Sequence, residues 1–394
     1  MAALQVKTPA KVAPRPNCPF PQNVRALVIS VWGANNFAGF SPVTHPMMTV
    51  KTTEFLNSKT SVMKPSQLSV YLQFAISNKF PVMIVGRPGI GKTDIVKDAA
   101  NKAQADLIIS HPVVSDPTDY KGLPFASGDG TADFLTFGEL KRLVTAKKKT
   151  VFFLDDLGQA SPLVQAACMQ LLLAREINGQ KISDHVTFIA ATNRRQDRAA
   201  VTGILEPVKS RFTSIVGLDV DIDDWASWAA SNSMPNELIA FMRFRPNFLS
   251  DFSPVADIEN IPSPRTIAAV GKQQLAGIPQ GLEIEAIKGA AGLTFAIEYT
   301  SFLMFCRDLP SLNDILEDPL KALVPQEVAS AYAICGVIAS IINKSNISTV
   351  LKYLDRLPIE NSVCCLKDAC LRNPAIASNR EFIEWASKHA SSLL

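Results

Sequence analysis

The residues most able to do chemistry in this chain are concentrated in one short segment, Gly86–Thr93, which reads GRPGIGKT. An apolar run, Pro81–Val85, precedes it, and a segment with helical character, Asp94–Ala103, follows it. In this strand–loop–helix order, glycines let backbone N–H groups point at phosphate oxygens, and the helix N-terminus adds partial positive charge. Lys92 can reach the terminal phosphates and the Thr93 hydroxyl can ligate a divalent cation. The segment therefore predicts a phosphate-binding loop, rather than a glycine-rich turn before an ordinary helix.

Two other apolar runs end in polar side chains. Thr150–Leu154 is followed by Asp155 and Asp156, and Val186–Ala191 leads into Asn193. An acid at such a strand end can hold Mg²⁺, and the acid after it can polarise an attacking water. If the two strands are neighbours, the amide lies beside the first acid and can orient that water or contact a phosphate. The alternatives are an acidic helix cap and an asparagine that caps a turn.

The spacing of the apolar runs predicts an α/β fold with a parallel sheet sandwiched by helices. The candidate strands are separated by helix-length connections, so their carboxyl ends should meet at one edge, where the site would lie. They comprise residues 81–85, 106–114, 150–154, 186–191 and 216–220. Helical spacing is found at residues 63–78, 135–145, 161–174, 223–231, 235–243, 263–275, 283–305, 328–342, 349–357 and 379–393.

Two glycine-containing segments predict hairpins inserted into this fold. Gly128-Asp129-Gly130 is a hairpin-tip sequence. Arg175–Ile182 reads REINGQKI, in which Asn178-Gly179 is a strong two-residue turn signal. We expect both to project from the sheet-and-helix core.

Composition and pattern divide the chain into three parts. Residues 1–61 begin with a Pro- and Lys-containing stretch, and we expect a partly disordered N-terminal extension there. Residues 62–220 hold the strands and the phosphate loop and form the predicted nucleotide-binding core. Residues 221–394 are predicted to be helical throughout.

The net charge and the number and spacing of the cysteines limit which class of protein this chain can belong to. The chain has 394 residues, 47% of them hydrophobic, and a formal net charge of +3, which is too small to argue for nucleic acid. Its seven cysteines have irregular spacings, as expected for reduced thiols in a cytoplasmic protein. No signal peptide is evident and the longest apolar run, Val328–Ile342, is shorter than a bilayer span, so no membrane association is expected.

Taken together, these elements resemble the MoxR branch of the AAA+ ATPases, in the helix-2-insert clade of P-loop NTPases. The segments that carry the resemblance are GRPGIGKT, FFLDDLGQASPLVQAACMQLL, REINGQKI, FIAATNR, LEPVKSRF and PSPRTIAAV. They occur in the family's order from about Pro65 to Val270, and weaker patterns continue beyond. The resemblance implies a P-loop AAA+ core followed by an all-α lid and C-terminal helices.

The resemblance also implies roles for individual residues. Asp155 and Asp156 match Walker B, Asn193 matches sensor 1, and Arg211 matches the arginine finger offered to the neighbouring subunit. Arg265 matches sensor 2, which reaches the nucleotide from the lid. ATP and Mg²⁺ are the implied cofactors, with Thr93 and Asp155 as metal ligands and Lys92 on the phosphates. The implied nucleotide-binding residues are Gly86, Arg87, Pro88, Gly89, Ile90, Gly91, Lys92, Thr93 and Asp94. Arg211 and Arg265 have a simpler interpretation as solvated arginines at helix ends.

The implied function is an ATP hydrolase that works as a homo-oligomeric ring, a hexamer, and remodels or activates a protein partner. In this family the partner typically carries a von Willebrand A domain. One departure is that Asp156 stands where the family has Glu, which puts fast hydrolysis in question. Two alternatives stay open: a nucleic-acid motor with a pore lined by Lys121, Arg175 and Lys181, and a scaffold that nucleotide only holds together. No motif in the sequence separates ATP from GTP.

Overall fold

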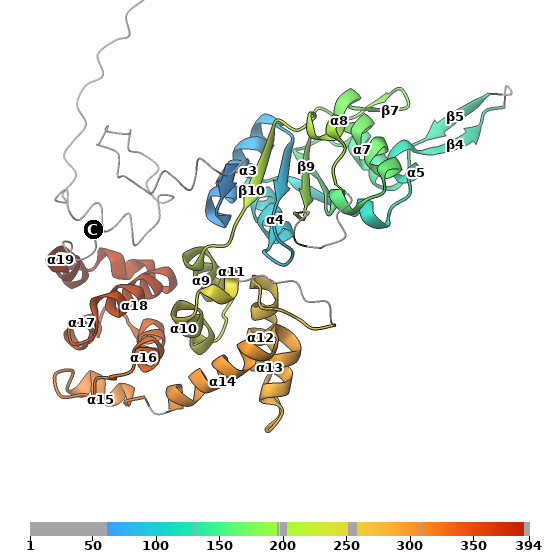
Figure 1. Cartoon of the computed structure of the whole chain (residues 1–394). Coiled ribbons are helices and arrows are strands. Elements are labelled where there is room, and N and C mark those ends of the chain that lie inside the picture. The colour runs from blue at the N-terminus through green and yellow to red at the C-terminus, as the bar shows by residue number, and fades with distance from the viewer. Residues whose placement is uncertain are drawn as a thin grey trace, which may run out of the picture.

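A computed structural model gives the conformation of residues 61–128, 131–194, 197, 203–250, 258–307 and 309–389. Residues 1–60 of the predicted N-terminal extension, residues 129–130 at the tip of the first hairpin and residues 390–393 of the last predicted helix lie outside these ranges. Within them, the predicted α/β fold is confirmed: a parallel sheet flanked by helices is followed by a helical region (Figure 1).

The central sheet has six strands in the order β1-β10-β2-β9-β6-β3, and every neighbouring pair is parallel. This order places β2, which precedes the phosphate loop, beside β9, and β9 beside β6. The short edge strand β1 had not been predicted from the sequence. The strands are β1 Ser61–Met63, β2 Val82–Val85, β3 Asp106–Ser110, β6 Thr150–Leu154, β9 Val186–Thr192 and β10 Ser214–Leu218.

Alternation along the strands explains why helices cover both faces. Val82 and Ile84 belong to one hydrophobic cluster, and Met83, between them, belongs to another. The first cluster is completed by α3 and α4, and the second by α5 to α8, so both sheet faces are buried. The helices are α3 Pro65–Asn78, α4 Lys92–Lys102, α5 Thr118–Lys121, α6 Gly138–Thr145, α7 Pro162–Ala174 and α8 Glu206–Lys209.

Both predicted hairpins are present and project from the core (Figure 1). The first pairs β4, Leu123–Ala126, with β5, Ala132–Leu135. The second pairs β7, Glu176–Ile177, with β8, Gln180–Lys181. Its turn residues Asn178 and Gly179 have φ values of 45° and 82°, the left-handed geometry that an Asn-Gly turn predicts.

Arg175 does not behave as a freely extended basic residue of the second hairpin. Its guanidinium donates to the backbone oxygens of Ser183 (3.1 Å) and Val186 (2.9 Å) and lies over the Phe188 ring. Arg175 therefore fixes the hairpin to β9, whereas Lys121 and Lys181 are exposed. Of the three basic residues considered for a pore, Arg175 is held by the protein itself.

The helical region contains two hydrophobic clusters, one formed mainly by α9 to α14 and one by α15 to α19. A single helix predicted over 283–305 is two helices, because Gly292 adopts φ 86° and a Cβ there would lie 2.7 Å from the Asn260 oxygen. The helix α18 was missed by the sequence analysis. The helices are α9 Ile222–Ser231, α10 Asn236–Phe244, α11 Asn247–Ser250, α12 Pro264–Ala276, α13 Glu283–Ala291, α14 Leu293–Arg307, α15 Leu312–Glu317, α16 Val328–Ile341, α17 Ile347–Leu354, α18 Ile359–Arg372 and α19 Arg380–His389.

The lengths and hydrophobicity of the helices bear on whether the chain could cross a membrane. In the part of the chain that the structure describes, none of them is both long enough and apolar enough to cross a bilayer.

Candidate active site

The phosphate loop continues β2 at the carboxyl edge of the sheet. The Gly86 amide donates to the Thr192 oxygen (3.1 Å), which extends the β2–β9 pairing by one step. Gly89 and Gly91 then take φ values of 75° and 88°, where a side chain would be strained, and α4 begins directly afterwards. The loop therefore has the strand–turn–helix geometry that phosphate binding requires.

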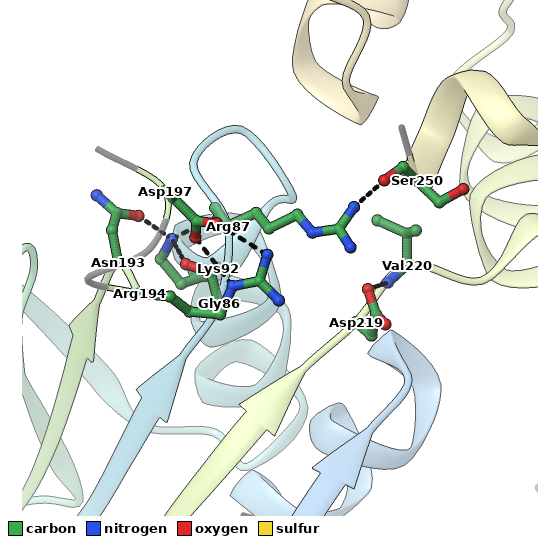
Figure 2. A network of polar contacts seen from close by, with 9 residues as sticks. All are labelled: Gly86, Arg87, Lys92, Asn193, Arg194, Asp197, Asp219, Val220 and Ser250. Carbon is green, nitrogen blue, oxygen red and sulfur yellow. Dashed lines mark hydrogen bonds and ion pairs between the residues drawn. The ribbon is translucent and has the colours of Figure 1, made fainter. Parts of the chain in front are cut away.

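Lys92 turns back across this loop and is only 7% exposed. Its Nζ donates to the backbone oxygens of Gly86 (3.1 Å) and Arg87 (2.9 Å) and to Asn193 Oδ1 (2.6 Å), as Figure 2 shows. Burial lowers the pKa of the Lys92 ammonium to about 8, against the opposing effect of the nearby Asp156 and Asp155 carboxylates. The cation thus lies among neutral oxygens, with no carboxylate in direct contact among the hydrogen bonds of the described residues.

Thr93 and Asp155 bring two hard oxygen donors together. The Thr93 hydroxyl donates to Asp155 Oδ2 (2.7 Å), and Asp155 is 8% exposed at the end of β6. A hydroxyl and a carboxylate next to a phosphate loop are the ligands Mg²⁺ takes from protein in such sites. The two residues therefore fit the predicted metal.

Asp156 and Asn193 also lie side by side, because β6 and β9 are neighbours. Asn193 Nδ2 donates to Asp156 Oδ1 (3.3 Å), and Asp156 adopts a left-handed φ of 56°. The structure thus brings together five of the residues singled out from the sequence, Lys92, Thr93, Asp155, Asp156 and Asn193, at one edge of the sheet.

The loop also contacts the helical region directly. The Arg265 amide donates to the Gly89 oxygen (3.0 Å), and a Cβ at Gly89 would lie 2.9 Å from Ser263 Oγ. Ser263 caps α12, accepting from the Thr266 amide, so the helix that carries Arg265 starts against the loop. The backbone of Arg265 therefore lies against the loop, and the sensor 2 role of its side chain stays a prediction.

Arg87 makes a second link between the two regions. Its guanidinium donates to the Ser250 backbone oxygen at the end of α11 (Figure 2). Its neighbours in the loop lie against β9 and α12, so the loop is held from both sides. No residue pattern signals this contact, since the partner is a backbone atom.

Arg211 is not at the phosphate loop of its own protomer. It lies just before β10, close to Thr213, whose amide donates to the oxygen of Pro81 at the start of β2. It is therefore near the amino edge of the sheet, opposite Gly86. Its Nε is buried and has no hydrogen-bond partner among the described residues. The structure does not bring Arg211 together with the other predicted site residues.

Two residues near the site were missed by the sequence analysis. Arg194 forms a double hydrogen bond with Asp197 (2.9 Å each), and Asp197 is 6% exposed (Figure 2). The pair ties Arg194, which directly follows Asn193, to a buried carboxylate. The acid three residues after Arg194 was visible in the sequence, but a short polar segment gave no reason to expect burial.

Comparison with known proteins agrees with this geometry. Residues 82–220 match the profile of the family described as "ATPase family associated with various cellular activities (AAA)". The segment begins with β2 and ends just after β10, so it contains the phosphate loop, the Asp155-Asp156 pair after β6 and Asn193 after β9. The chain therefore contains an AAA ATPase domain, and its reaction is ATP hydrolysis.

Similarity to individual proteins is weak. A point mutant of RuvB from Thermotoga maritima has a TM-score of 0.37 and 17% sequence identity, covering 65% of this chain and 75% of that chain. NtrX from Brucella abortus in complex with ADP has a TM-score of 0.38 and 12% identity, covering 89% of this chain and 68% of that one. No curated protein sequence matches the chain.

Proposed function

We propose that the protein is a MoxR-like AAA+ ATPase that hydrolyses Mg²⁺-ATP at subunit interfaces of a ring, a hexamer, to remodel or activate a protein partner. The observation that supports this best is the convergence of Lys92, the Thr93–Asp155 pair and Asn193 at one sheet edge. Arg265 approaches the same loop from the lid.

Each group has a distinct task in this mechanism. The loop amides and Lys92 bind the β- and γ-phosphates, and Asp156 with Asn193 holds the attacking water. Thr93 and Asp155 would hold Mg²⁺, which when bound neutralises charge on the phosphates. Arg265 stabilises the negative charge that develops on the transferred phosphoryl group.

Arg211 is the reason to propose a ring. It is distant from its own loop, yet its Nε is buried without a partner in the described residues. An arginine supplied by a neighbouring subunit would stabilise the transition state only after assembly. Hydrolysis should therefore depend on protein concentration and on nucleotide-driven association.

The test is a mixing experiment with two inactive variants. Lys92→Ala removes the phosphate contact and Arg211→Ala removes the proposed finger, so each alone should release little phosphate. Mixed rings contain interfaces that pair an intact loop with an intact Arg211, so mixing should restore activity. Mixtures as inactive as the separate variants, at concentrations where light scattering detects a ring, would contradict the proposal.

The Asp156→Asn variant can be used to identify the protein partner, because it should bind ATP without hydrolysing it. We expect it to retain a protein partner, one with a von Willebrand A domain, in a pull-down. Salt-dependent stimulation of wild-type hydrolysis by DNA or RNA would favour the nucleic-acid motor instead. Because Asp156 is shorter than the usual Glu, a scaffold remains the second candidate, and phosphate release equal to that of Lys92→Ala would favour it.

A further inference from the structure

Gln159 connects two side chains of the candidate site. It ends the short 3₁₀ helix η3, Leu157–Gln159, directly after the acidic pair, and is partly buried. The side-chain amide of Gln159 is oriented so that its nitrogen faces acceptors and its oxygen faces a donor. In this orientation Gln159 Nε2 donates to Asp156 Oδ1 (3.1 Å) and to the Asp156 backbone oxygen (3.2 Å). Its Oε1 accepts from Asn193 Nδ2 (2.8 Å). Both ends of the amide are therefore used.

These contacts complete a directed chain of hydrogen bonds. Lys92 Nζ donates to Asn193 Oδ1 at 2.6 Å, and Asn193 Nδ2 donates to Gln159. Gln159 in turn donates to the Asp156 carboxylate. The chain runs from a cation to an anion with every donor pointing the same way, so each bond polarises and strengthens the next. It also fixes which end of each amide faces which neighbour.

We propose that Gln159 is a positioning residue for the hydrolytic water, acting through Asp156 and Asn193; this rests on the function proposed above. By holding Oδ1 of the carboxylate, the amide fixes the side-chain orientation of Asp156 and so the direction of its other oxygen.

The first test replaces Gln159 by leucine, which is similar in size but forms no hydrogen bond. We expect the kcat of ATP hydrolysis to fall about 10- to 100-fold, since a misplaced catalytic group costs rate rather than binding. The dissociation constant for a fluorescent ATP analogue and the unfolding midpoint should stay near the wild-type values. Gln73→Leu, which removes a partly buried glutamine amide on α3, is the matched control and should leave kcat unchanged.

A double-mutant cycle with Asn193→Ala shows whether the effect passes through this chain of hydrogen bonds. Asn193 Nδ2 donates to Gln159 Oε1 at 2.8 Å, so removing either side chain breaks the same chain. Gln159→Leu should therefore lower kcat much less in the Asn193→Ala background than in the wild type. Losses in kcat that multiply would overturn the inference.

Gln159→Glu adds a pH readout that a purely structural role would not move. A carboxylate facing Asp156 makes it harder to ionise both groups, so the acid limb of the kcat profile should move to higher pH. A wild-type protein that hydrolyses ATP, with Gln159→Leu and Gln159→Glu behaving like it, contradicts this inference alone. Wild-type hydrolysis no faster than that of Lys92→Ala contradicts the proposed function, and the role of Gln159 with it.

Discussion

Lys92 and Arg243 are both buried cations, but the protein satisfies them in different ways. Lys92 lies among backbone and amide oxygens, and burial lowers its pKa to about 8. Arg243 joins α10 to α9 and α18, and its guanidinium donates to Asp368 (2.6 Å) and to Asp223. Although burial opposes it, these carboxylates hold the pKa of Arg243 above its usual value. Among the described residues, the hydrogen bonds of Lys92 go to neutral oxygens, whereas Arg243 is paired with two carboxylates.

This difference separates a functional charge from a structural one. A buried charge with full carboxylate pairing stabilises one arrangement of its neighbours and strongly resists the loss of either partner. A buried charge with neutral partners costs stability, and such sites are typical of binding and catalysis. The comparison predicts opposite consequences for removing the two cations.

The largest expected effect is on hydrolysis by Lys92→Met. Loss of the phosphate contact should lower the ATPase rate about 1000-fold or more, because the cation stabilises charge in the transition state. The free energy of unfolding should be unchanged or higher, since an incompletely paired buried ammonium has been removed. Phosphate release and urea denaturation measure the two quantities.

Lys102→Met is the matched control for that variant. Lys102 is on the same helix, but it is exposed and paired with Asp98 at 2.7 Å. Replacing Lys102 should change neither the ATPase rate nor the free energy of unfolding appreciably. A Lys92→Met variant that is strongly destabilised and still hydrolyses ATP at the normal rate would contradict the contrast between Lys92 and Arg243.

Arg243→Met should show the reverse behaviour. It leaves the Asp368 carboxylate, whose side chain is 9% exposed, without its main partner, which should cost about 3–5 kcal/mol of unfolding free energy. Adding Asp368→Leu removes the uncompensated charge and should recover most of that loss. A single variant as stable as the wild type in urea denaturation would show that this ion pair is not structural.

The third prediction concerns pH. Folded Lys92 releases its proton near pH 8, whereas in the unfolded chain it does so near 10.5. Between these values the unfolded state binds more protons, so the free energy of unfolding should rise with pH, by up to about 3 kcal/mol in total. Comparing wild type with Lys92→Met at several alkaline pH values isolates this contribution. Parallel stability curves for the two proteins would contradict it.

Much of the fold was predictable because it depends on local pattern. Continuous apolar runs identified β2, β6 and β9, and the Asn-Gly turn identified the second hairpin. The adjacency of Asp155 and Asn193 followed from the expectation that their strands are neighbours. For the strands and the turn, a few consecutive residues contain the physical cause.

The remaining contacts join segments far apart in the sequence, and no local pattern marks them. The Arg87 guanidinium bonds a backbone oxygen on α11, which any residue there would offer. Gln159 was one polar residue in a short turn until the structure placed Asn193 beside it. Likewise, the Asn260 oxygen leaves no room for a Cβ at Gly292, where the two helices meet, and helical spacing alone does not reveal this contact.

The most direct measurement of the central claim is proton uptake when Mg²⁺-ATP binds, from calorimetry near pH 8 in two buffers with different ionisation enthalpies. Lys92 is then about half protonated, and contact with phosphate favours its charged form. We predict net uptake of about half a proton by the wild type, none by Lys92→Met, and wild-type uptake by Lys102→Met. Equal uptake by wild type and Lys92→Met, or equally tight ATP binding by the two, would contradict the account.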